Sequence, residues 1–210
     1  MTAVPYRRRR RTPIVAVVSV LAVIAAVTWT VVLVGASGPG GPQSCPTPAA
    51  GPAPGATLEP GALDGVVPAP PAAVPVRVLN AGGQRGQANL VAAQLGDLGF
   101  GSAGAPDNDP FYPDGDMECV GQIRFGAAGE AAASTLTLVL PCAELVRDDR
   151  PDAGVDVSVG TGFGDVDPPR PVRDVLETLG APSPADDGED AAPEPPDPAA
   201  LAQARDAIPC

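Results

Sequence analysis

The chain has 210 residues, with 25 acidic residues, 13 arginines, no lysine and no histidine, so its net charge is −12. Five arginines, Arg7 to Arg11, lie near the start, and the other 8 stand against 25 acidic residues, which gives residues 12–210 a charge of −17. This charge excludes nucleic acid as an expected partner, because nucleic-acid binding depends on basic side chains at the phosphates. The missing histidine excludes Ser-His-Asp triads, Cys-His nucleophile pairs and histidine-ligated zinc.

An uncharged and almost wholly apolar run, residues 14–36, follows the arginines. An α-helix of about 20 such residues crosses a hydrocarbon core of roughly 30 Å. Because a short basic flank stays on the cytoplasmic side, we expect a cytoplasmic basic tail over 1–13, a single transmembrane helix over 14–36, and an extracytoplasmic remainder. The alternative is a cleaved signal peptide, whose apolar region would be shorter than this one.

Two further segments have the composition of linkers. Residues 37–74 are dense in Pro, Gly and Ala and almost free of charge, which predicts a partly extended spacer. Residues 181–210 form an acidic, Pro-rich tail that ends in Cys210, and its part before residue 199 is predicted to be disordered. Residues 75–180 remain as one small domain. Leu201, Ala204 and Ile208 predict a last amphipathic turn or two that brings Cys210 back to it.

The domain opens with a predicted strand, Val76 to Leu79, that leads into a glycine-rich turn. A helix is predicted next, because apolar residues then recur at helical spacing at Ala88, Val91, Ala92, Leu95 and Leu98. Gly99 lies where a left-handed cap is needed and Phe100 where a hydrophobic contact closes such a cap, so the helix should end near Leu98.

Later elements are predicted in the same way. "GQIRF", 121–125, and "VDVSVG", 155–160, indicate strands. Residues 129–145 are ambiguous between helix and strand; we favour a helix, because the connection to the later strand must cover the sheet and Pro141 marks a stop. A helix beginning near Pro171 and ending at Gly180 is predicted from the spacing of Val172, Val175, Leu176 and Leu179.

The glycine-rich turn follows the pattern GGxxG, whereas a dinucleotide loop needs GxGxxG for the backbone to approach a pyrophosphate. We therefore interpret it as a structural corner in which glycine supplies positive φ and close strand-helix packing. The alternative is a ligand-binding loop, in which the helix amino terminus and Arg85 bind an anionic cell-wall group. That loop would comprise Asn80, Gly82, Gly83, Gln84, Arg85 and Gly86.

Carboxylates gather in residues 107–119, but their order does not match an EF-hand, so we interpret the stretch as a polar loop with no metal. No catalytic residue, metal or cofactor is expected. A hydrolase or transferase would have to use a carboxylate pair from the set Asp107, Asp109, Asp114 and Glu118.

Four cysteines, Cys45, Cys119, Cys142 and Cys210, follow the apolar run, and an even number in an oxidising compartment predicts disulfides. Of the three possible connectivities we favour Cys119 with Cys142 and Cys45 with Cys210. Free or intermolecular thiols are the alternative. No CxxC pair occurs, so the sequence does not support thiol exchange or a zinc ribbon.

The stretch "VRVLNAGGQRGQANLVAAQLGDLGF" resembles the opening of the LytR carboxy-terminal type domain. The matching residues are Asn80, Gly86, Ala88, Leu95, Gly99 and Phe100. With the apolar run, "CVGQIRFG" and "PCAELVRDDRPDAGVDVSVGTGF", the chain as a whole resembles an actinobacterial family that maintains cell-envelope integrity. The resemblance implies a small α/β sandwich, strand-helix-strand repeated, outside the membrane helix, and a pairing of Cys119 with Cys142 fits the closer relatives.

In larger relatives this domain follows a transferase domain that attaches polymers to peptidoglycan, and that domain is absent here. The resemblance therefore supplies no catalytic residues. We expect a non-enzymatic, membrane-anchored extracytoplasmic protein that supports envelope integrity by binding cell-wall polymer or envelope proteins. The alternative is a carboxylate-dependent cell-wall hydrolase or transferase.

Overall fold

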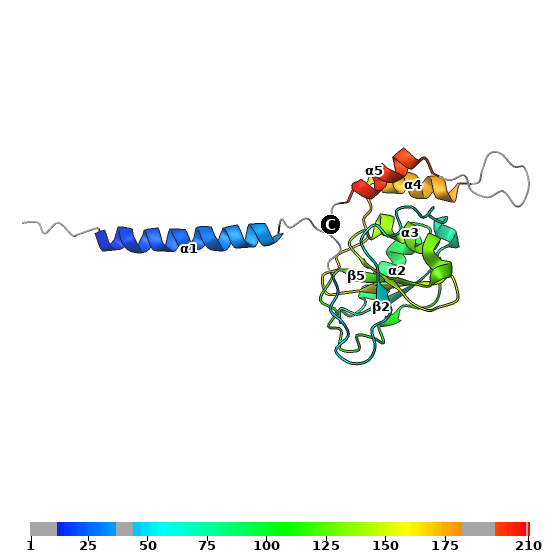
Figure 1. Cartoon of the computed structure of the whole chain (residues 1–210), viewed down its shortest axis with the longest axis horizontal. Helices are drawn as coiled ribbons and strands as arrows, with labels where there is room; N and C mark the ends of the chain where they lie inside the picture. Colours follow the sequence, from blue (N-terminus) through cyan, green and yellow to red (C-terminus); the bar gives the residue numbers. More distant parts are fainter. Residues whose placement is uncertain (1–11, 37–43, 182–195, 209) are drawn as a thin grey trace, which may run out of the picture. The chain divides into compact units, whose positions relative to one another are not determined.

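The computed structural model describes residues 12–36, 44–181, 196–208 and 210, with side chains between 12 and 36 described only for 17–30. The chain divides into two units, Met1–Pro39 and Gly40–Cys210. The first contains one helix, α1 (Thr12–Ala36), shown in blue in Figure 1. In the described residues, no helix combines the length and the apolar character needed to cross a membrane. The predicted basic tail lies almost wholly outside the described residues.

The second unit is built on a mixed sheet. Its strands are β1 (Ala56–Thr57), β2 (Pro75–Asn80), β3 (Gly101–Ser102), β4 (Asp107–Asn108), β5 (Gly121–Phe125), β6 (Glu144–Arg147) and β7 (Val155–Val159). The spatial order is β1-β6-β5-β7-β2-β3, with β4 also beside β2. β2 runs parallel to β7, and β5 runs parallel to β6 but antiparallel to β7.

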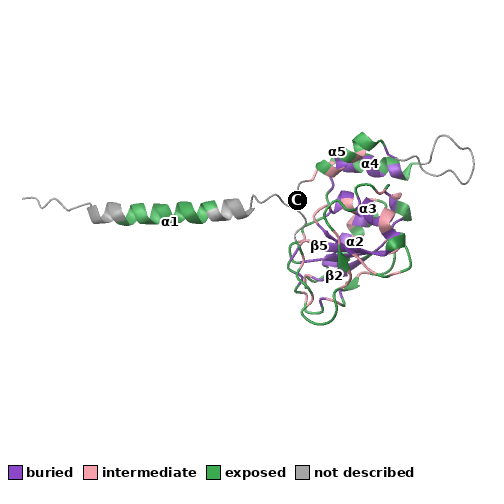
Figure 2. Ribbon diagram, viewed as in Figure 1, coloured by how far each residue is buried: buried purple, intermediate pink, exposed green. Residues whose placement is uncertain are grey.

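Helices cover one face of this sheet. They are η1 (Pro71–Ala73), α2 (Gln87–Asp97), η2 (Ala127–Gly129), α3 (Glu130–Val139), α4 (Arg170–Gly180) and α5 (Pro198–Asp206). α2 packs on β2, α3 packs on β5, and α5 contacts both α3 and α4 (Figure 1). Alternate residues of β5, Ile123 and Phe125, are fully buried under the helices, and burial extends through the sheet and the helix faces in Figure 2. The predicted α/β fold is confirmed.

The ends of the helices follow the sequence signals. After α2, Gly99 has φ 87°, the amide of Phe100 donates to the carbonyl of Leu95 at 3.1 Å, and the amide of Gly99 donates to Gly96 at 2.9 Å. These two bonds form the predicted left-handed cap. The ambiguous stretch is a helix, as we favoured, but α3 ends at Val139 and the four residues of β6 follow Pro141.

The expected spacer over 37–74 is wrong for its described part, because residues 44–74 pack on the domain. Leu63 is 3% exposed and Val74 is fully buried. The hydroxyl of Ser134 donates to the carbonyl of Val66 at 3.0 Å, and the hydroxyl of Thr135 donates to that of Ala69 at 2.7 Å. Pro and Gly made this stretch resemble a linker, yet α3 binds its carbonyl groups and the core takes up its few apolar side chains. Residues 37–43 lie outside the described residues.

The predicted return of the tail is confirmed. Asp197 caps α5 by accepting from the amide of Ala199 at 2.9 Å, and Ala204 is 1% exposed in the core. Residues 182–195, where disorder was predicted, lie outside the described residues.

Candidate functional site

The turn between β2 and α2 adopts a conformation that requires glycine. Gly83 has φ 70° and Gly86, which precedes α2, has φ 83°, a region that residues with a side chain rarely enter. A Cβ on Gly82 would stand 2.7 Å from the carbonyl carbon of Gly160. The side-chain Nδ2 of Asn80 donates to the backbone carbonyl of Gln84 at 3.0 Å and holds the turn closed. The geometry is that of the predicted corner, and ligand binding by this loop stays a prediction.

A hollow of about 310 Å³ opens at this corner, lined by Gly82, Gly83, Gln84, Gln87 and Thr161. We call it the corner hollow. It lies where β2 and its parallel neighbour β7 end, because Thr161 follows β7 by two residues. In open α/β sheets, ligands bind outside the carboxyl ends of the strands. Arg85 is exposed on the same turn but does not line the hollow.

Two amide side chains at the corner have a buried oxygen without a hydrogen-bond partner among the described residues. These are Oε1 of Gln87, a residue that is 8% exposed, and Oδ1 of Asn80. A buried acceptor left unpaired costs about 1–3 kcal/mol. The corner therefore holds unsatisfied hydrogen-bonding capacity.

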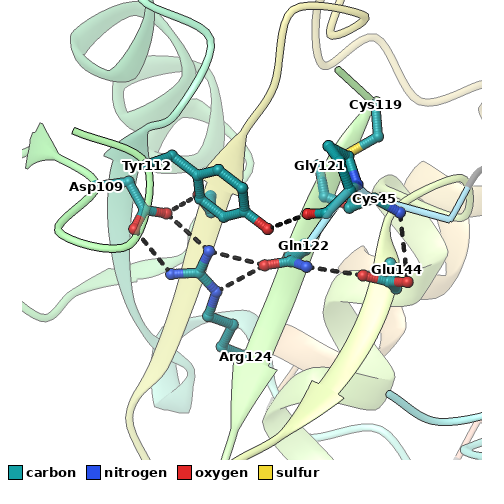
Figure 3. The surroundings of a disulfide bond; sticks show 10 residues. Cys45, Asp109, Tyr112, Cys119, Gly121, Gln122, Arg124 and Glu144 are labelled. Atoms are coloured by element: carbon teal, nitrogen blue, oxygen red, sulfur yellow. Dashed lines mark hydrogen bonds and ion pairs between the residues drawn. A yellow bond between two sulfur atoms is a disulfide. The ribbon is translucent and has the colours of Figure 1, made fainter. Parts of the chain in front are cut away.

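The opposite face of the sheet is covered by loops and carries a buried ion pair (Figure 3). Nη2 of Arg124 lies 2.8 Å from Oδ2 of Asp109, and their side chains are 1% and 0% exposed. The hydroxyl of Ser158 donates to Asp109 as well. Oε1 of Gln122 accepts two bonds from Arg124, at 2.9 and 2.7 Å. Nε2 of Gln122 then donates to Glu144 at 2.7 Å, so the network extends to β6.

Two aromatic rings and the segment that contains β1 cover this network. The rings of Phe111 and Tyr112 lie 5.0 and 5.8 Å from the guanidinium of Arg124. We call residues 44–58 the amino-terminal strap. The hydroxyl of Tyr112 donates to the carbonyl of Pro46 in the strap at 2.6 Å. Burial raises the pKa of Tyr112, so the hydroxyl stays protonated and remains a donor.

This arrangement weakens the carboxylate-enzyme alternative. Asp109 is held in a buried ion pair, while Asp107, Asp114 and Glu118 are exposed. In the ranges that the structure describes, no group of three or more His, Cys, Asp or Glu residues could hold a metal ion. The network offers Asp109 no free approach to a substrate, so its chemistry is structural.

A second ion network lies on the same face. Asp156 lies 3.0 Å from Arg77 and 2.9 Å from Arg150, which also contacts Asp148 at 2.6 Å. Burial alone would raise the pKa of Asp156, but hydrogen bonds from both arginines outweigh it and the pKa is lowered. The pKa of Asp148 is lowered in the same way by Arg150. Both carboxylates therefore stay ionised. Asp156 on β7 joins Arg77 of β2 to Arg150 in the segment between β6 and β7, and Asp148 contacts the same arginine.

All four cysteines form disulfides, but the favoured pairing is wrong. Cys45 pairs with Cys119 and Cys142 pairs with Cys210. The prediction treated Cys45 as part of a spacer, whereas the strap lies over the buried network. Cys45, which is part of the strap, therefore lies beside the loop that carries Cys119. Cys142 lies between α3 and β6, near the end of α5, and so meets the returning tail.

Sequence reasoning missed Thr161 and the buried network. A signal for the network was present, because Gln122 and Arg124 alternate with Ile123 and Phe125 along β5. The polar residues of such a pattern normally face solvent. Here a loop and the strap cover them, and spacing along the sequence does not reveal that cover.

These features define a class of protein: a small mixed α/β domain with two disulfides and a glycine corner after its longest strand. Residues 73–163 match the family described as LytR cell envelope-related transcriptional attenuator. The chain is 41% identical over 164 residues to the cell envelope integrity protein Cei of Mycobacterium tuberculosis, covering 76% of each chain.

The fold also matches a crystal structure, the soluble domain of a conserved hypothetical secreted protein from Mycobacterium marinum. The TM-score is 0.63 and the identity 39%, over 74% of this chain and 98% of that one. The chain belongs to the family of the cell envelope integrity protein Cei, with a LytR carboxy-terminal type domain. The predicted resemblance is confirmed.

Proposed function

We propose that this protein is a membrane-anchored, extracytoplasmic binding protein that supports the integrity of the cell envelope without catalysis. The observation that carries the proposal is its 41% identity, over most of its length, to a protein named for cell envelope integrity. The corner hollow is the binding site in this proposal, and a polymer of the cell wall is its partner.

An extracytoplasmic location is supported by the disulfides. Both pairs join residues far apart in the chain, with sequence separations of 74 and 68. Such bonds persist in oxidising compartments and are rare in the cytosol, where thiols are kept reduced. The similar protein from M. marinum is described as secreted.

Membrane anchoring is supported by the apolar run 14–36 and the five arginines before it. Val17, Leu21 and Ile24 are 59%, 60% and 55% exposed. A helix that is apolar all round is stable when lipid surrounds it, and costs free energy in water. Carbonate extraction of membranes should leave the full chain in the pellet and release a variant without residues 14–36. Release of the full chain would contradict the anchor.

Action by binding is supported by the state of the carboxylates. The buried carboxylate of the 107–119 loop, Asp109, neutralises Arg124 and so contributes to folding. The corner hollow, in contrast, is open, and one of its lining residues, Gln87, has a buried side-chain oxygen without a hydrogen-bond partner among the described residues. Incubation of the purified full-length protein with cell-wall glycan should give no cleavage or transfer product. Turnover that is lost in Asp114→Ala or Glu118→Ala would support the enzyme alternative.

The envelope role is tested by permeability to a dye and to detergent in a strain deleted for this protein. We expect the deletion to leak and the full-length chain to restore the barrier. A deletion strain as tight as its parent would contradict the proposed role.

A further inference from the structure

The two disulfides lie in different surroundings. Cys119 is 1% exposed and packs in a small apolar cluster with Tyr112, and Cys45 packs against the same cluster. Cys142 and Cys210 are both half-buried, and neither belongs to an apolar cluster of the described residues. Reduction begins when a thiolate attacks a disulfide sulfur, so its rate depends on access to the sulfurs. The bond between Cys142 and Cys210 is therefore expected to be reduced first.

This second bond fastens α5 to the domain. Cys210 lies just after α5, and Cys142 lies between α3 and β6. The helix is thus connected at both ends, by the backbone before Pro198 and by the disulfide after Asp206. A helix of nine residues is too short to be stable by itself in water. It therefore depends on these connections and on its packing.

The packing of α5 is slight, and most of the helix is exposed in Figure 2. Ala204 is its buried residue. Three neighbouring apolar residues are partly buried against the core: Leu201, Ala207 and Ile208. In the described part of the chain, Arg205 makes the side-chain polar contacts from α5 to the domain, because Nη1 donates to the carbonyl of Asp64 at 2.7 Å and Nε lies 3.7 Å from its Oδ1. The side chain of Asp64 is 68% exposed, and exposed ion pairs contribute little to stability.

The sheet has a core that does not depend on α5. Residues 73–163 match the family, and β2 to β7 with α2 and α3 all lie inside this range, whereas α5 lies beyond it. Ile123 and Phe125 of β5 are fully buried against the helices of this part. Loss of α5 should therefore leave the sheet folded.

A cavity of about 470 Å³ lies beside α5. Arg205 and Asp206 form one wall, and the segment 57–61 with Leu63 forms another. Leu63 is 3% exposed and belongs to the core. Departure of α5 would remove the first wall and expose Leu63 and Leu58 to solvent.

We propose that the disulfide between Cys142 and Cys210 is a redox-sensitive latch that holds α5 beside this cavity. The reductant is a dithiol. One of its thiolates attacks a sulfur of the bond and forms a mixed disulfide, and the other cysteine leaves as a thiolate that takes up a proton. The second thiol of the reductant then displaces the remaining cysteine, so that both cysteines become thiols and the dithiol becomes a disulfide.

Once the latch is reduced, α5 separates from α3 and α4, and the cavity opens. The sheet and the bond between Cys45 and Cys119 stay intact. The latch thus couples the redox state of the surroundings to exposure of an apolar surface, and it does so whether or not the corner hollow binds a polymer.

The test treats the full-length protein in detergent micelles with dithiothreitol, followed by iodoacetamide and peptide mapping. We expect Cys142 and Cys210 to be alkylated at least about tenfold faster than Cys45 and Cys119, because their bond is the more accessible. At that stage, hydrogen exchange of the amides of residues 201–207 should rise by about tenfold or more, while β5 stays protected. Alkylation of all four cysteines at one rate, or of Cys45 and Cys119 first, would overturn the inference. So would an α5 that stays protected after its bond is reduced.

The double variant Cys142→Ser/Cys210→Ser opens the latch without a reductant. In oxidising buffer it should show the same rise in exchange over residues 201–207 and should bind the hydrophobic dye ANS more strongly than the parent. Gln203→Ala, at an exposed position on α5, is the control and should change neither result. A variant in which β5 also loses protection would show that the bond holds the whole domain, and would overturn the inference.

Discussion

Arg124 and Asp109 form a salt bridge of 2.8 Å between Nη2 and Oδ2 on the loop-covered face of the sheet, and both side chains are shielded from solvent. Arg124 is the last residue but one of β5 and Asp109 lies in the loop after β4. The pair thus joins the long 107–119 loop to the centre of the sheet. Removing one partner would leave the other charge buried without compensation.

We predict that Asp109→Ala lowers the free energy of unfolding by about 3–5 kcal/mol, the loss typical of a broken buried ion pair. The exposed Asp114, in the same loop, is the matched control, and Asp114→Ala should change stability little. Urea denaturation followed by circular dichroism measures both. Equal stability of the two variants would show that the buried pair does not stabilise the loop-covered face.

Reduction of the disulfides should destabilise the second unit. The bond between Cys45 and Cys119 closes a separation of 74 residues, for which chain entropy gives about 4 kcal/mol. The double variant Cys45→Ala/Cys119→Ala should therefore melt well below the parent in oxidising buffer. Peptide mapping without reductant should recover Cys45 with Cys119 and Cys142 with Cys210. Recovery of Cys119 linked to Cys142 would contradict this connectivity.

Replacing a glycine of the corner and a glycine inside α2 by alanine should have opposite effects on stability. Gly86 has φ 83° and open space around a built Cβ, so Gly86→Ala costs only backbone strain, about 1–2 kcal/mol. Gly96, inside α2, also has open space and an ordinary φ, so Gly96→Ala should stabilise by about 0.5–1 kcal/mol. Thermal unfolding of the two single variants measures the difference. Stabilisation of both would mean that the corner does not require positive φ.

Stability should also fall in acid because of Asp156. Its pKa in the folded protein lies below the ordinary 3.8, so its stabilising contribution is present above that pH and is lost as pH falls through the folded value. Asp156→Asn should cost about 2 kcal/mol at pH 7, since it weakens charged hydrogen bonds. The gap between variant and parent should shrink below pH 3.8. A gap that stays constant from pH 7 to pH 2.5 would contradict the assignment.

The sequence predicted the elements with strong local signals. β2 and α2 could be predicted from the spacing of their apolar residues, and Gly99 marked the end of α2 at the position that this spacing also indicates. β6 was not predicted, because its first two residues lie in the ambiguous stretch 129–145, which we interpreted as a helix that stops at Pro141. β1 and β3 have two residues each and exist through pairing with distant strands, which local patterns do not encode.

The candidate site was predicted in part. The glycines of the corner and Gln84 were found from the motif, whereas Gln87, the first residue of α2, was not among the predicted loop residues. Thr161 comes from a segment about 75 residues later, and only the parallel pairing of β2 with β7 brings it to the hollow. The strap and the pairing of Cys45 were missed for a related reason. The composition of a segment indicates whether it can form a hydrophobic core of its own. It does not indicate whether the segment packs over the core of a neighbouring domain.

The central claim is that the protein supports the envelope by binding at the corner hollow. Its most direct test is permeability of the deletion strain after complementation with a variant altered at Gln84, Arg85 and Gln87, each changed to alanine. A matched control carries alanine at the exposed Gln203, Asp114 and Glu118. We predict that both proteins fold and reach the membrane, that the control restores the barrier, and that the corner variant leaves the cells leaky. Full rescue by the corner variant would contradict the claim and leave the glycine turn as a structural corner.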